Sequence, residues 1–442
     1  MSICCGCESH LNSLIRAAGL LLRSWLLLLP LVCHGQAGPA LSLDDAVATA
    51  LEHSPALAGL RAEADAIRTL PSQEAALPDP VLSLNAMNMP VDTFDFDQEP
   101  MTQMQIALSQ RFPFPGKRKL RRQAAEYRAG ASAAMFDEGR SLLLGRVKMS
   151  WWRLLNMDRA LQIVEQNKEL MRNFVEIAHT KYKVGDGLQQ DVLLAQLELS
   201  RLLDRELRLR GSRRGAQAEL NALMNRPADR TIQLPAAPPD TRLPELPAEQ
   251  LLLQRAGAER ALIEVQRGLV DAARARLDVA KKDRLPDFRL GVGYGFRQGI
   301  DPLRATDRPD LLTVMLSVDV PLYSGSKQKK AVEQRTHEVS RQQYIFTDTL
   351  RSVEASVSRN LADYRAARDQ VALLESAIIP QAQQTVSSML AGYRVNQVDF
   401  MNLVNTQITL YNAQIDYWES LSGAKQALAG LAAAVGTEAL YE

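Results

Sequence analysis

Residues 102–117 read TQMQIALSQRFPFPGK and join a strand pattern to the start of a helix pattern. Apolar and polar residues alternate as far as Phe112, which is typical of a strand with one apolar face. Proline lacks the N–H that a β ladder requires, so Pro113 and Pro115 end the strand. Gly116 then allows the backbone to change direction. We therefore predict a strand-to-helix switch at Pro113, Pro115 and Gly116.

The segment after this switch is long and contains no proline between Gly116 and Arg226. As one helix, residues 117–182 would span about 100 Å. Coiled-coil periodicity is indicated by apolar or small residues seven apart. The two series are Leu188, Ala195, Leu202, Leu209, Ala216 and Leu223, and Leu403, Leu410, Tyr417, Ala424 and Leu431. Pro380 interrupts a second long helix and is expected to kink it.

Three further segments alternate in the same way, residues 81–88, 288–297 and 311–320. Alternation over about ten residues is typical of transmembrane barrel strands, although a half-buried strand of a soluble sheet has the same period. The glycine-rich polar face of 288–297 and an export signal favour the membrane. Four strands cannot close a barrel, so we expect three chains to share one of twelve strands. The long helices would then project into the periplasm.

The chain contains an internal duplication. Tyr182-Lys-Val-Gly and Tyr393-Arg-Val-Asn begin matching segments 211 residues apart. Prolines concentrate in residues 227–247, which excludes a regular helix and marks a boundary. Each copy is expected to run helix, strand, strand, long helix, helix. We predict five parts: a signal peptide at 1–37, a first repeat at 38–226, a linker at 227–247, a second repeat at 248–437 and a tail at 438–442.

The N-terminus has the pattern of an export signal. An apolar stretch ends in small residues, which predicts cleavage after Ala37, and a short membrane anchor is the alternative. All four cysteines precede Ala37, so the mature chain would contain none. Cys33 as a lipid-attachment site stays open. After the signal, Ser42 is expected to cap a helix that reaches about Leu70.

Composition and charge exclude several classes of function. The 442 residues carry a formal net charge of +1, which gives no electrostatic case for nucleic acid as a partner. The sequence shows no His/Cys/Asp/Glu cluster with metal-ligand spacing, no nucleophile–base pair and no phosphate-binding loop. It therefore predicts a protein that is not an enzyme and that has no cofactor and no bound metal.

Together these features resemble the TolC-like outer-membrane efflux proteins over residues 41–437. The resemblance is carried by Leu41-Ser-Leu-Asp-Asp-Ala, His53-Ser-Pro-Ala-Leu, Leu77-Pro-Asp-Pro, Phe112-Pro-Phe-Pro-Gly-Lys, Val320-Pro-Leu-Tyr-Ser-Gly and the Tyr-x-Val turns at 182 and 393. It implies a mixed α and β membrane protein that forms a homotrimer. A 12-stranded outer-membrane β-barrel, with four strands per chain, would continue into a long periplasmic α-helical coiled-coil barrel.

The resemblance also implies a function and partners. The implied function is the passive exit duct of a tripartite efflux pump, embedded in outer membrane lipid. Its partners would be a periplasmic adaptor protein and an inner-membrane pump of the resistance-nodulation-division type. The motifs at 77–80 and 112–118 look nearest to heavy-metal cation efflux. The alternatives are a duct for type I protein secretion or drug efflux and, in another class, a soluble periplasmic coiled-coil scaffold.

Most of the functional residues that the resemblance implies lie near the periplasmic tips. Adaptor contact falls on Tyr182, Val184, Gly185, Gly187, Tyr393, Val395 and Asn396. The resemblance assigns closure of the tip to Asp191 and Tyr393, which match residues of a polar link between neighbouring hairpins. The arginine that the family has in this link is replaced by Val398 in this sequence. Asn402 and Asn405 stand where family acids line the narrowest aperture.

A second strand-to-helix switch is predicted at Pro321 and Gly325. Beside the first switch, the basic run 117–119 has two interpretations. It is either an electrostatic gate for cargo, or a basic cluster at the membrane edge or at a solvated helix end.

Overall fold

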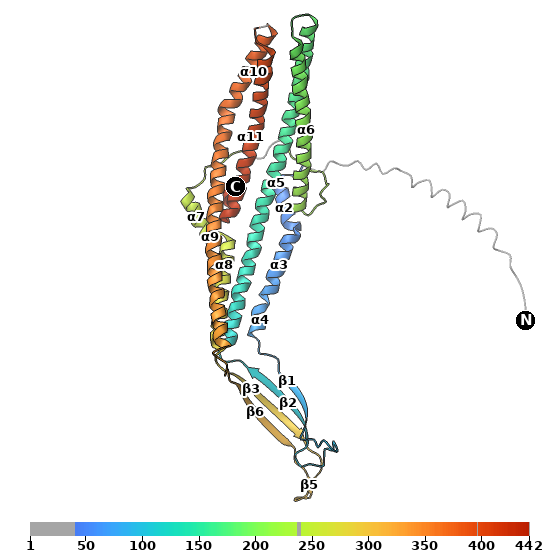
Figure 1. Cartoon of the computed structure of the whole chain (residues 1–442), viewed down its shortest axis with the longest axis vertical. Helices are drawn as coiled ribbons and strands as arrows, with labels where there is room; N and C mark the ends of the chain where they lie inside the picture. Colours follow the sequence, from blue (N-terminus) through green and yellow to red (C-terminus); the bar gives the residue numbers. More distant parts are fainter. Residues whose placement is uncertain (1–39, 237–239, 396, 442) are drawn as a thin grey trace, which may run out of the picture.

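The computed structural model describes residues 40–236, 240–395 and 397–441, so the predicted signal peptide and Cys33 lie outside the described residues. Figure 1 shows long, nearly parallel helices with a sheet at one end and two helical hairpins that end together at the other. The first half contains α2 (Leu43–His53), α3 (Pro55–Arg68), α4 (Leu70–Ala75), β1 (Val81–Met87), β2 (Gln103–Phe112), α5 (Lys117–Lys183) and α6 (Gln189–Leu223).

The second half has a similar order of elements. It contains α7 (Glu249–Glu259), α8 (Ala261–Lys282), β3 (Asp287–Phe296), β6 (Leu311–Asp319), α9 (Gln328–Leu373), a π-helical turn (Leu374–Ile378), α10 (Ile379–Arg394), α11 (Phe400–Val435) and a 3₁₀ turn (Glu438–Leu440). A small hairpin of β4 (Ile300–Asp301) and β5 (Thr306–Asp307), which the sequence did not predict, extends the loop after β3. The exact bounds of the two repeats stay a prediction.

The predicted long helix is continuous as α5, which packs along α6, α8 and α11. Most of the sevenfold series is buried, for example Ala195, Leu202 and Leu403, whereas its first member, Leu188, is exposed. Near mid-length, Trp151 donates a hydrogen bond to the carbonyl of Leu41 at 3.1 Å. The neighbouring Trp152 donates to the Tyr441 hydroxyl at 2.6 Å, so α5 holds both ends of the described chain. Within the described residues, no helix is long and apolar enough to cross a membrane.

The N-terminal helix differs from its prediction. The Ser42 hydroxyl accepts a hydrogen bond from the Asp45 N–H at 3.0 Å, so the predicted cap is confirmed. The single helix to Leu70 is wrong, because α2 ends at His53 and α3 begins at Pro55. Ser54 caps α3, and proline is well tolerated at the first position of a helix. For the same reason Pro71 lies in the first turn of α4 rather than ending a helix.

The predicted kink near Pro380 coincides with a change of helix type. A π-helical turn spans Leu374–Ile378, and α10 begins at Ile379. Proline has no N–H to donate and its ring crowds the carbonyl four residues earlier. The π turn, which is wider than an α-helical turn, includes the residue whose carbonyl the ring of Pro380 would crowd.

Four strands form one antiparallel sheet in the order β1-β2-β3-β6, and each end lies within one residue of the predicted segment. Its register places apolar residues opposite one another, for example Leu84 with Ile106, Ile106 with Tyr294, and Tyr294 with Leu312. These side chains are exposed, so one whole face of the sheet is apolar and uncovered. Among the described strands, β1 and β6 are each paired on one side alone.

The opposite face of the sheet is polar and closely packed. Gln105 lies across from Gly295 and beside Gly293, where an added Cβ would come within 2.9 Å of the Gln105 amide nitrogen. The same amide donates to the Thr313 hydroxyl at 3.3 Å. The glycines of β3 therefore leave room for glutamine side chains that lie flat across the strands.

Candidate functional site at the hairpin tips and the strand-to-helix junction

The turn between α5 and α6 carries most of the predicted tip residues. Tyr182 and Val184 are exposed there. Gly185 has φ +85°, a left-handed conformation that favours glycine. Gly187 does not have a positive φ, contrary to its predicted suitability for one. Its constraint is space, because an added Cβ would lie 2.9 Å from the Lys181 Cβ.

The second tip lies beside the first. Val395 is exposed, as predicted for a contact residue, and Asn396 lies outside the described residues. Tyr393 is instead 5% exposed, with its ring 5.2 Å from that of Phe400. Packing of this ring between the hairpins makes Tyr393 part of the tip core rather than of its outer surface.

Lys181 joins the two hairpins, and the sequence did not single it out. Its Nζ donates to the Tyr393 carbonyl oxygen at 2.7 Å and lies 4.2 Å from the centre of the Tyr393 ring. This contact links the end of α5 to the end of α10 through a hydrogen bond and a cation–π interaction. The sequence feature that could have drawn attention to Lys181 is its position directly before the Tyr182-Lys-Val-Gly motif. The partner is 212 residues away, so local spacing could not reveal the link.

Acidic groups surround this contact. Burial raises the pKa of Asp191, and the nearby Asp399 carboxylate raises it further. Burial likewise raises the pKa of the Tyr393 phenol, with smaller effects of Asp191 and Asp399 in the same direction. The Tyr393 hydroxyl has no hydrogen-bond partner in the part of the chain that the structure describes. The structure therefore brings Asp191 and Tyr393 close together without a direct hydrogen bond, and their role in closure stays a prediction.

The two predicted aperture residues share one groove. Asn402 and Asn405 are exposed on α11 and line a cavity of about 470 Å³ together with residues of α10. The Thr406 hydroxyl donates to the Asn402 backbone carbonyl at 2.7 Å. Uncharged amides and hydroxyls are thus concentrated just beyond the tip.

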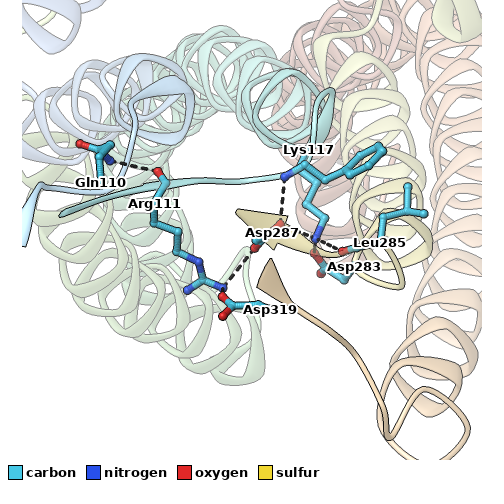
Figure 2. Close-up of polar contacts among 8 residues, drawn as sticks. Gln110, Arg111, Lys117, Asp283, Leu285, Asp287 and Asp319 are labelled. Carbon is cyan, nitrogen blue, oxygen red and sulfur yellow. Dashed lines mark hydrogen bonds and ion pairs between the residues drawn. The ribbon is translucent and has the colours of Figure 1, made fainter. Parts of the chain in front are cut away.

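The strand-to-helix junction contains an ion-pair network centred on the buried Lys117, which Figure 2 shows. Lys117 is 3% exposed, and its Nζ lies 2.8 Å from Asp287 Oδ1 and 3.4 Å from Asp283 Oδ1. The same Asp287 accepts from the backbone N–H of Phe114 at 2.9 Å and pairs with Arg111 at 3.1 Å. This network, which we call the junction cluster, joins the end of β2, the start of α5 and the start of β3.

Both interpretations of the basic run were wrong for Lys117. The side chain is neither a solvated gate nor a lipid-facing charge, because two carboxylates from the α8–β3 connection enclose it. Arg118 is also engaged, donating to the Ala75 carbonyl oxygen at 2.7 Å, whereas Lys119 is exposed. The acids that pair with Lys117 lie about 170 residues away, so the run by itself could not show its role.

The predicted switch residues lie between strand and helix. β2 ends at Phe112 before Pro113 and Pro115, and Gly116 has φ +91° at the N-cap of α5. In the second switch β6 ends before Pro321, and α9 begins after Gly325. No residue of the described chain approaches a Cβ added at Gly325, so packing gives no reason for glycine there.

No group of three or more His, Cys, Asp or Glu residues suited to a metal ion occurs within the described ranges.

A family model described as outer membrane efflux protein matches residues 46–226 and 252–437. This chain belongs to that family. The resemblance found in the sequence is confirmed, and the protein is an outer-membrane protein with a large periplasmic portion. The family and the similar solved structures are channels rather than enzymes.

Individual relatives are distant. The alkaline protease secretion protein AprF of Pseudomonas aeruginosa is 24% identical over 65% of this chain, and the match spans 61% of that protein, less than two thirds of its length. The cobalt-zinc-cadmium resistance protein CzcC of Cupriavidus metallidurans is 21% identical over 90% of this chain and 91% of its own. The structure of the outer membrane protein VceC from Vibrio cholerae superposes with a TM-score of 0.74 at 19% identity, over 90% of this chain and 97% of that one, which shows the fold.

Proposed function

We propose that this protein is the outer-membrane exit duct of a tripartite efflux pump and that three copies share one 12-stranded barrel. The observation that carries the proposal is the four-stranded sheet, with an exposed apolar face and two edges that pair on one side alone. Burying one large apolar side chain is worth roughly 1.5–3 kcal/mol, so a face of this kind is suited to lipid rather than water. Unpaired edges require partner strands, which two further copies would supply.

The helices would form the periplasmic tunnel. At about 1.5 Å per residue the 67 residues of α5 reach on the order of 100 Å from the sheet. The tips therefore lie far from the outer membrane, where a periplasmic adaptor and an inner-membrane pump of the resistance-nodulation-division type can meet them. The exposed Tyr182, Val184 and Val395 would contribute to the adaptor contact.

For the cargo we propose heavy-metal cations. The support is the match to the cobalt-zinc-cadmium resistance protein, which covers about nine tenths of both chains. A duct for protein secretion is the second candidate, supported by the match to the alkaline protease secretion protein. Deleting the gene and measuring growth in cobalt, zinc and cadmium salts, alongside secreted protein, separates the two. Unchanged metal tolerance together with lost secretion would favour the secretion duct over the metal-efflux duct.

The oligomer and the pore have a direct test. We expect the detergent-extracted full-length protein to have the mass of a trimer and to conduct ions in planar bilayers. A stable monomer that forms pores would overturn the shared barrel. Protein that washes from membranes with carbonate and forms no pore would favour the soluble scaffold instead.

A further inference from the structure

Four helices line an open pocket close to the junction cluster. Its volume is about 260 Å³, and α4, α5, α8 and α9 all contribute to it. Alanines on facing helices leave the space open, among them Ala124, Ala280 and Ala331. Asp283 lines the pocket and also contacts Lys117, so the pocket adjoins the end of the sheet.

Arginines dominate the charge of this pocket. Its walls include Arg121 and Arg128 from α5, Arg276 from α8 and Arg335 from α9. Arg121 and Arg128 are seven residues apart and therefore lie on the same helix face. The carboxylates in the lining are those of Glu74 and Asp283. Four guanidinium groups thus meet two acids, one of which is shared with Lys117.

Three of these guanidinium groups make no hydrogen bond or ion pair within the described residues. Arg335 pairs with Glu338 at 2.6 Å. By contrast, no hydrogen bond or ion pair joins Arg121, Arg128 or Arg276 to another residue in the portion of the chain that the structure describes. A guanidinium group stays protonated at neutral pH and carries five donors, so each of these residues has its full capacity to bind an anion.

Arg276 is crowded by like charges. This residue is partly buried, and burial lowers the pKa of its guanidinium group. The neighbouring charges of Arg128 and Arg335 lower it further, against a smaller opposing effect of Glu338 and Glu74. Like charges that crowd a partly desolvated cation are relieved when a multivalent anion occupies the space between them.

We propose that this pocket binds a phosphate group. Guanidinium groups approach it from α5, α8 and α9, and a phosphate offers oxygens in several directions, whereas a carboxylate offers two in one plane. Arg121 and Arg128 lie only about 6 and 17 Å along α5 from its start at the sheet. The phosphate can therefore belong to a phospholipid headgroup of the nearby leaflet or to inorganic phosphate in solution.

Arg276→Gln tests the site, with Arg274→Gln as the matched control. Arg274 is on the same helix, is exposed and pairs with Asp271 at 3.1 Å. Calorimetric titration of the purified full-length protein with inorganic phosphate should give an affinity about tenfold or more lower for Arg276→Gln, the effect of losing one charged hydrogen-bonding group. Arg274→Gln should bind like the wild type. Without phosphate, the unfolding temperature of Arg276→Gln should not fall, because a crowded charge has been removed.

A second arm identifies the source of the phosphate. The protein is equilibrated with phosphatidylglycerol vesicles, and retained lipid is counted by native mass spectrometry. Lipid retained by wild type and control but lost from Arg276→Gln assigns the pocket to a headgroup. Equal lipid retention with weakened phosphate binding assigns it to the free anion. If Arg276→Gln and Arg274→Gln show the same phosphate affinity and the same lipid retention, the site does not exist.

Discussion

Lys117 shows how one residue can fix the geometry of the junction. Its buried ammonium group contacts Asp287 and the partly exposed Asp283, while Asp287 is also held by Arg111 and by the Phe114 N–H. We expect Lys117→Met to destabilise the protein by about 1.5–3 kcal/mol, the contribution of a hydrogen bond to a charged group. The exposed neighbour Lys119→Met is the control and should change stability by no more than about 0.5 kcal/mol. Chemical denaturation followed by fluorescence measures both, and equal midpoints would contradict the structural role of Lys117.

A second residue-scale prediction concerns pH at the tips. Asp191 has a raised pKa in the folded chain, so the folded state binds its proton more tightly than the unfolded chain does. Stability from this group is therefore full below the ordinary value of 3.8 and is lost as the pH rises through the raised pKa. Lys181 and Asp399 face the same group with opposing effects.

Asp191→Asn should remove the loss of stability that accompanies ionisation of Asp191 at rising pH, because an amide side chain is neutral without binding a proton. We expect slower amide hydrogen exchange at the tip in the variant than in the wild type at pH 7, and similar exchange at pH 3, below the ordinary pKa of 3.8. Mass spectrometry of peptides spanning 186–192 and 393–400 measures it. Faster exchange in the variant at pH 7 would show that the ionised carboxylate holds the tip together.

At the scale of elements, the α5–α6 turn depends on two glycines for different reasons. Gly185 needs its positive φ, while Gly187 lies against Lys181 and the backbone of Tyr182. Replacing both by valine should strain the turn and weaken cross-linking to the adaptor severalfold without loss of the trimer. Gly211→Val on α6 is the control, because no atom lies within 4 Å of its added Cβ. Unchanged cross-linking in the double variant would exclude the turn from the adaptor contact.

The elements also show what the sequence could and could not predict. The alternation of apolar and polar residues predicts all four strands to within one residue at each end. It does so because successive side chains of a strand point to opposite faces, and here one face is apolar and the other polar. The break at Ser54 was missed because Ser-Pro both ends one helix and starts the next. The pairing of Lys117 with Asp287 and the contact of Lys181 with Tyr393 depend on long-range packing, which no local pattern encodes.

At the scale of the whole molecule, the proposed duct must let cations leave. Asn402 and Asn405 lie three residues apart on α11 and share one groove, so both present amides on the same face. If three chains place this face around the aperture, six amides form a polar but uncharged ring. Six carboxylates would instead attract and retain multivalent cations. An uncharged ring is therefore suited to a duct that releases metal ions.

Asn402→Asp combined with Asn405→Asp converts the amides to carboxylates with little change in shape. We expect the variant to be blocked by a trivalent cation severalfold more strongly than the wild type and to select more strongly for cations. Single-channel conductance in planar bilayers, with and without the trivalent ion, measures both properties. Asp in place of Asn412, which lines a different pocket on the same helix, is the matched control and should leave the block unchanged. Equal block of the double variant and the wild type would show that this face of α11 lies away from the aperture, because a ring of carboxylates in the narrowest passage cannot leave a trivalent cation unaffected.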